Sequence, residues 1–179
     1  FFRNYYSPNN ASLAIGGNFN SVKAKKLVKK YFDNIESGKK LEEINTDSIE
    51  LNETKKVVHK DNVQISRIYF AWHSDKAYSE DDAALDILAD ILAGSKNSRL
   101  YKNLVHDLQI AQDVSAFQYS AKYNGVLFLI VSVKHEIELS IIREKVFETI
   151  NELIKSGVNE KEIVRAVNGY KSSFIYSLQ

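Results

Sequence analysis

The residues from Leu92 to Ala116 have the types and the order that could perform chemistry. They read LAGSKNSRLYKNLVHDLQIAQDVSA and combine a glycine turn, a Ser98-Arg99 pair, a helical pattern with a histidine, and then a strand pattern. A serine nucleophile of the hydrolase type stands in a G-x-S-x-G turn, which the sequence lacks. The GSKNS segment lacks the second glycine and the adjacent Lys-Ser/Thr of a phosphate-binding loop, and it follows a helical pattern rather than a strand. We therefore expect this turn to be structural.

The spacing of the candidate metal ligands does not indicate a metal site either. The chain contains four histidines, which are His59, His73, His106 and His135, and it contains no cysteine. A catalytic zinc site takes three converging protein ligands, commonly two from one helical turn, but no two of these histidines lie within five residues of each other. Neither H-E-x-x-H nor H-x-x-E-H occurs, and HEIEL at His135 lacks the second histidine. The prediction is that this chain holds no catalytic residue and no metal ligand, and it assigns no substrate-binding residue.

Composition and charge describe an ordinary soluble globular protein. Of the 179 residues, 44% are hydrophobic and 26% are charged, and the net charge is +1. This balance gives no electrostatic reason to expect nucleic acid as a partner, and no apolar run approaches the roughly 20 residues that cross a bilayer. The absence of methionine predicts that the chain is part of a longer protein. The compartment stays open, with a periplasmic or extracytoplasmic location as one option.

The pattern of apolar residues predicts two regions. Residues 1–36 are interpreted as the C-terminal piece of a preceding α+β domain, with a strand at Ala11–Gly17 and a helix that is capped by Asn20 or Ser21. Lysines cover the other side of that helix, from Lys23 to Lys30, and are expected to form a solvated face. Residues 37–54 are polar and are predicted to be a linker. Residues 55–179 are predicted to form a second α+β repeat domain.

Within residues 55–179 we expect first a hairpin that turns at Asp61-Asn62, with a bulge near Ser66-Arg67. A helix should then open at a capping box of Ser79 and Asp82 and end at Gly94. A second helix should follow, with Ser98 as its N-cap.

The remaining pattern predicts two strands and two helices. The strands cover residues 114–119 and 126–133, and Asn124-Gly125 is a hairpin signal. The first helix should end at Gly157, and the second should be capped by Asn159 with Glu162. The second helix is expected to bury Ile163, Val167, Tyr170 and Phe174. Together these elements predict an α+β fold with a mixed or antiparallel sheet and helices packed on one face, preceded by the last strand and helix of a similar domain.

Several sequence blocks resemble the pitrilysin/insulinase family of zinc metallopeptidases. FFRNYYSPNNASLAIGGNFN is similar to a segment in which Y-x-P-N-N-A leads into an apolar strand and a Gly-Asp turn, although Asn18 replaces the usual Asp. YFDNI, ISRIYFAWH, ALDILADILAGSKNSRLYKNLV and IAQDVSA follow in the family's order and spacing. The blocks span nearly the whole chain. AGSKNSRL is less glycine-rich than the family's turn, which implies a less mobile loop.

The resemblance implies a zinc-dependent peptidase built from halves of two similar domains each. It implies that the zinc-binding H-x-x-E-H lies upstream of Phe1, so zinc is expected in the full-length protein and not in this fragment. Inactive halves of the family tend to carry a substrate-holding Arg and Tyr, and the matching positions here are Val105 and Gln112. The resemblance therefore favours the half that carries zinc. A second homologous half, in the same chain or another subunit, is the implied partner.

Three functional hypotheses follow. The first is a non-catalytic wall of the chamber of a peptide-hydrolysing zinc enzyme. The second is a catalytically inactive homologue that acts as a structural or partner subunit. The third is an unrelated binding module that uses the lysine face. In each case Arg99 needs an explanation, because a cation in the first turn of a helix opposes the helix dipole. We expect a carboxylate or backbone carbonyls to compensate its charge and to make Arg99 a fold-stabilising residue.

Overall fold

The computed structural model describes residues 1–42 and 51–178, and these residues belong to two compact units, Phe1–Glu53 and Thr54–Gln179. Each unit is described by itself. Residues 43–50, which are 8 of the 18 residues of the predicted linker at 37–54, lie outside the described residues. The three predicted domain ranges therefore remain a prediction.

The first unit contains three short or medium helices, α1 (Phe2–Tyr5), η1 (Pro8–Asn10) and α2 (Ser21–Phe32). The predicted cap of α2 is confirmed, because the Asn20 side chain accepts a hydrogen bond from the Lys23 amide at 3.0 Å. The predicted strand at residues 11–17 is wrong. These residues adopt no strand, and Leu13 and Ile15 are 60% and 51% exposed. A strand requires a neighbour for its backbone groups, and none of the described strands pairs with this segment.

The PNN motif connects the start of the first unit with the end of that unit through hydrogen bonds. The Asn9 side chain donates to the Lys39 carbonyl at 3.0 Å and accepts from the Gly38 amide at 2.9 Å. A side chain at Gly38 would meet the Ser7 side chain, so glycine is needed for this close approach. The motif that carried part of the family resemblance therefore closes a loop and contributes no reactive group.

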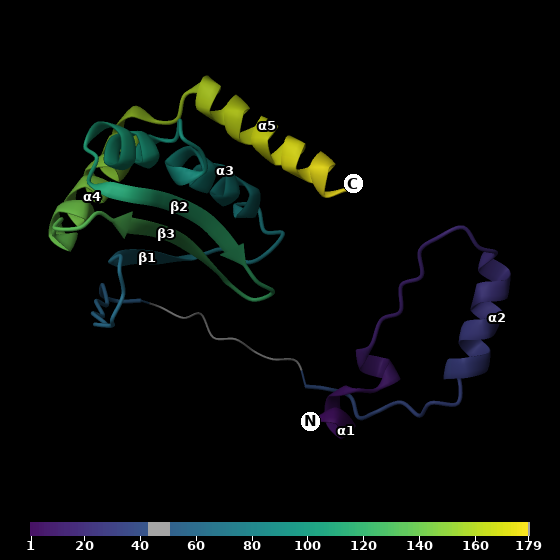
Figure 1. The fold of residues 1–179 in the computed structure, drawn as a ribbon. Coiled ribbons are helices and arrows are strands. Elements are labelled where there is room, and N and C mark those ends of the chain that lie inside the picture. The colour runs from purple at the N-terminus through teal and green to yellow at the C-terminus, as the bar shows by residue number, and fades with distance from the viewer. Residues whose placement is uncertain (43–50, 179) are drawn as a thin grey trace. The chain divides into compact units, whose positions relative to one another are not determined.

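The second unit is a three-stranded antiparallel sheet with its helices on one side (Figure 1). The strands are β1 (Arg67–Ser74), β2 (Ala111–Ser120) and β3 (Gly125–Val133), in the order β1-β3-β2. The helices are α3 (Asp82–Ala93), the π-helix η2 (Tyr101–Asp107), α4 (Leu139–Ser156) and α5 (Glu160–Ser177). The predicted α+β class with helices on one face is confirmed. None of the helices in the part of the chain that the structure describes is long and apolar enough to cross a membrane.

The core lies between the sheet and these helices. It contains fully buried leucines and valines from both layers, which are Leu100, Leu104, Leu129, Val131 and Val146, together with Ile142. Ile68, Phe70 and Trp72 of β1 pack against this cluster from the edge of the sheet. The alternation of β1 and β3 thus places one set of side chains under the helices and the other on the opposite face.

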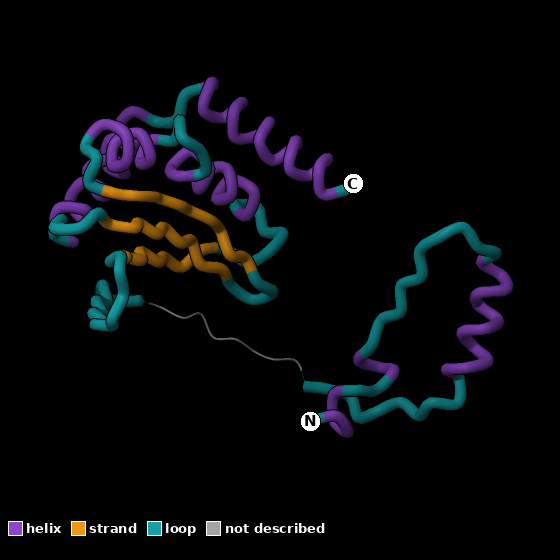
Figure 2. The backbone as a smooth tube through the Cα atoms, viewed as in Figure 1, coloured by secondary structure: helices purple, strands orange, loops and turns teal. Residues whose placement is uncertain are grey.

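The predicted hairpin at Asp61-Asn62 is wrong. Residues 54–66 form loops, as the teal trace before the first orange strand shows in Figure 2, and Val57 is 90% exposed. The bulge predicted near Ser66-Arg67 is also wrong, because β1 begins at Arg67 and keeps one phase throughout. The change of phase in the sequence marks the start of the strand. A register shift does occur, in β2 between Ala111 and Asp113.

The helix boundaries agree with several predicted caps and differ at others. Asn159 and Glu162 form the predicted capping box of α5, and α4 ends at Gly157, which has a positive φ of 71°. The capping box at Ser79 is wrong: α3 begins at Asp82, and the Asp82 carboxylate accepts instead from the Tyr78 amide at 2.8 Å.

The predicted buried face of α5 is wrong as well. Ile163 is 39% exposed and Phe174 is 66% exposed, whereas Ala166 is fully buried and Glu162 is only 9% exposed. Helical spacing identifies a stripe, but the neighbouring element decides which stripe is covered. Here α5 meets α3, and the Tyr170 hydroxyl donates to the Asp86 carbonyl oxygen at 3.2 Å.

Gly125 has a different role from the one that its position after Asn124 suggests. The hairpin between β2 and β3 is confirmed, but Gly125 lacks the positive φ of a type I′ turn. It pairs with Ser74 on one side and Ser120 on the other. A methyl group there would meet the Asp75 carbonyl oxygen and, at 2.7 Å, the Ser74 hydroxyl. Glycine is therefore required by close packing at the end of the sheet.

We predict that Gly125→Ala lowers the free energy of unfolding by about 2 kcal/mol, because the backbone of Asp75 must move to admit the methyl group. Urea denaturation of both proteins measures the difference. Gly169→Ala is the matched control: it lies in α5 with no atom within 4 Å of the added carbon, so it should stabilise by roughly 0.5–1 kcal/mol. Equal effects of the two substitutions would contradict the assignment.

Candidate functional site

The Leu92–Ala116 stretch is the part of the chain whose residues most resembled a reactive site. Its turn, Gly94–Ser98, connects α3 with the helical segment that begins at Arg99. Ser98 is fully buried, and its hydroxyl donates to the Ser95 carbonyl oxygen at 2.5 Å. The prediction that the Ser98 side chain caps the next helix is wrong, because this hydroxyl accepts no amide, although the Ser98 carbonyl oxygen does accept the Lys102 amide at 3.0 Å. A buried hydroxyl that donates to its own turn has no access to a substrate.

Arg99 carries the strongest interactions of the stretch. Its Nε and Nη2 atoms each donate to one carboxylate oxygen of Glu162 at 2.8 Å. Nη2 also donates to the Gly157 carbonyl oxygen at 2.8 Å, and Nη1 donates to the Ser156 hydroxyl at 3.1 Å. The expectation that a carboxylate and backbone carbonyls compensate this cation is confirmed. We call these residues, Arg99, Ser156, Gly157, Asn159 and Glu162, the Arg99 junction.

The Arg99 junction joins three elements. The helical segment that begins at Arg99 supplies the guanidinium, the end of α4 supplies a carbonyl and a hydroxyl oxygen, and the first turn of α5 supplies the carboxylate. The Glu162 carboxylate also accepts the Asn159 amide at 2.9 Å. The hydrogen bond from Arg99, with help from the Asn159 amide, lowers the pKa of Glu162 from its ordinary 4.5 to about 2, against the opposing effect of burial.

Sequence reasoning missed Glu162 as the partner of Arg99. It identified Glu162 only as the third residue of a capping box, and 63 residues separate the two side chains. A capping glutamate uses its carboxylate on one backbone amide, so three oxygen sites remain for other donors. These free acceptor sites were the sequence signal that Glu162 binds a further donor, but they do not specify which cation donates to them.

The π-helix η2 follows the junction. Its wide turn is closed by a hydrogen bond from the Leu108 amide to the Asn103 carbonyl oxygen, five residues earlier, at 2.9 Å. The Asn103 side chain donates to the Thr149 hydroxyl of α4 at 2.8 Å. The chain then turns into β2 through Gln109, which has a φ of 54°. These contacts fix the stretch from both sides and give it a structural role.

Gln109→Gly should raise the free energy of unfolding by about 0.5 kcal/mol. Relief of the left-handed strain of a non-glycine residue, roughly 1–2 kcal/mol, exceeds the entropy that glycine loses on folding. Thermal melts measure the change. Ser115→Gly, six residues later in β2, is the control and should destabilise, because Ser115 pairs in register with Ile130 of β3. Destabilisation by both substitutions would show that Gln109 is not strained.

The four histidines do not come together. His106 contacts its neighbour Asp107 at 2.7 Å, with side chains 76% and 59% exposed, and His135 is 89% exposed beside Glu136. His73 points to the face of the sheet away from the helices, and His59 is in the loop before β1. In residues 1–42 and 51–178, no three side chains among His, Cys, Asp and Glu are grouped as a metal site requires. The described residues therefore do not fit a zinc ion.

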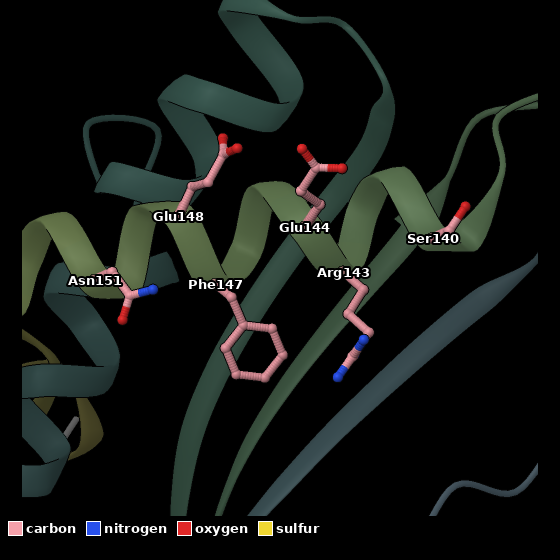
Figure 3. A pocket seen from close by; sticks show the side chains of 6 residues that line it. All are labelled: Ser140, Arg143, Glu144, Phe147, Glu148 and Asn151. Carbon is pink, nitrogen blue, oxygen red and sulfur yellow. The ribbon is translucent and has the colours of Figure 1, made fainter.

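Two hollows mark the surface of the second unit. One is lined by a single face of α4, where the Arg143 guanidinium lies 5.5 Å from the centre of the Phe147 ring. The side chains of Glu144 and Glu148 extend to the other side of the helix in Figure 3, and Glu148 forms an ion pair with Lys145 at 2.7 Å. The other lies at one end of the sheet and is lined by Gln112 and the turn from Lys134 to Ile137. Val105 and Gln112, which the resemblance aligns with a substrate-holding Arg and Tyr, provide neither a guanidinium nor a phenol. Each hollow includes a serine, Ser140 in the first and Ser66 in the second, and within the described residues neither serine is hydrogen-bonded to a histidine.

The sequence matches the family described as the peptidase M16 inactive domain over residues 1–170. The chain belongs to this family. Membership confirms the resemblance to the pitrilysin/insulinase metallopeptidases and agrees with the absence of assembled catalytic groups in the described M16 domain.

Relatives of this M16 chain include proteases. The zinc protease PqqE of Helicobacter pylori is 25% identical over 180 residues, which are 98% of this chain and 40% of that protein. The crystal structure of a protease from Helicobacter pylori is also 25% identical, with a TM-score of 0.77, and it covers 98% of this chain and 43% of that one. This M16 chain thus spans about two fifths of the length of these relatives.

A further solved structure shares the fold. A chain of complex III2 from Candida albicans superimposes with a TM-score of 0.69 over 99% of this M16 chain and 43% of its own length. The identity is 14%, so this likeness shows the fold alone.

Proposed function

We propose that this M16 domain is a non-catalytic wall of a zinc-dependent peptidase that hydrolyses peptides. The observation that carries the proposal is the family match over residues 1–170, together with a 25% identical zinc protease that aligns over 98% of the chain. The Arg99 junction supports it, because the guanidinium of the candidate reactive stretch is bound to Glu162, Ser156 and Gly157. In the full-length protein, zinc and the general base would come from an upstream segment, and a second homologous half would close the chamber.

The test of this proposal uses the full-length protein and the 179-residue chain side by side. After dialysis, the full-length protein should retain zinc and cleave a quenched fluorescent peptide, whereas the 179-residue chain should do neither. Stoichiometric zinc in the short chain, with cleavage abolished by changing His73 or His106, would overturn the proposal. A periplasmic or extracytoplasmic location remains part of the proposal and is tested by cell fractionation.

A second candidate function is a structural or partner subunit without peptidase activity. The fold shared with a chain of complex III2 favours this alternative. Zinc retention by the full-length protein discriminates between the two, since an inactive homologue would lack the upstream ligand set.

Arg99 offers a separate check on the non-catalytic role. In the full-length protein, we expect Arg99→Ala to lower the melting temperature and to leave the turnover of the folded fraction nearly unchanged, because each of its three side-chain nitrogens donates within the junction. Turnover is measured below the melting temperature of the variant. Unchanged stability with a tenfold loss of turnover, about 1.4 kcal/mol of transition-state stabilisation, would place the stretch in the active site.

A further inference from the structure

We draw no further inference here: the strongest candidate, the exposed apolar and aromatic face of the sheet away from the helices, on which Tyr69, Phe117 and Tyr119 lie, carries nothing because nothing in the structure shows what covers it.

Discussion

Replacing Glu162 with glutamine is expected to lower the free energy of unfolding by about 3 kcal/mol, the cost of breaking a buried ion pair from one side. Glutamine is nearly the same size, but its amide nitrogen cannot accept the second donor of Arg99. The guanidinium then stays largely enclosed, 20% exposed, without its counterion. Urea denaturation measures the loss. Glu160→Gln is the control in the same first turn of α5 and should cost less than about 1 kcal/mol, since it removes only a charge near the helix dipole.

The same carboxylate predicts a dependence of stability on pH. The pKa of Glu162 is lowered in the folded protein, from 4.5 to about 2, so the folded state favours the ionised form. This contribution is fully present above about pH 4.5 and is lost as the pH falls toward 2, because the unfolded chain takes up the proton first. Glu162→Gln should therefore flatten the stability curve between these values. Parallel curves for the wild type and the variant would mean that the junction does not hold the carboxylate ionised.

Local signals in the sequence predicted the parts of the fold that depend on local chemistry. The Asn20 cap, the capping box of Asn159 and Glu162, and the end of α4 at Gly157 are each set within a few residues, and the structure confirms them. The predicted strand at residues 11–17 and the predicted hairpin at Asp61-Asn62 were wrong because an apolar run forms a strand only when a neighbouring strand accepts its backbone groups. The buried stripe of α5 was wrong for a similar reason, since its position against α3 decides which residues are covered.

The candidate site also has features that the local sequence predicts and features that only the tertiary fold determines. Sequence reasoning predicted that the cation at Arg99 needs compensation, because the helix dipole is a local property. It did not predict Glu162, Ser156 or Gly157 as the partners, because the α4 to α5 turn reaches Arg99 only through the tertiary fold. The apolar side chains on the face of the sheet away from the helices were hidden for the opposite reason. Tyr69, Phe117 and Phe128 look like ordinary core residues until the register places them together on the side without helices.

Truncation of Leu104 to alanine should cost about 3 kcal/mol of unfolding free energy, because it leaves a cavity in a packed core. Leu104 is fully buried within η2, and its side chain belongs to the central cluster with Leu100 and Leu129. Leu108, four residues later and 44% exposed, is the matched control, and Leu108→Ala should cost less than about 1 kcal/mol. Denaturant titrations of the two variants give the comparison. If Leu104→Ala were tolerated as well as Leu108→Ala, η2 would be a loosely held segment, and its π-helical turn would have to be reconsidered as a moving part of a site. A large difference would instead show that the histidine-bearing helix of the Leu92–Ala116 stretch is anchored in the core and serves as scaffold.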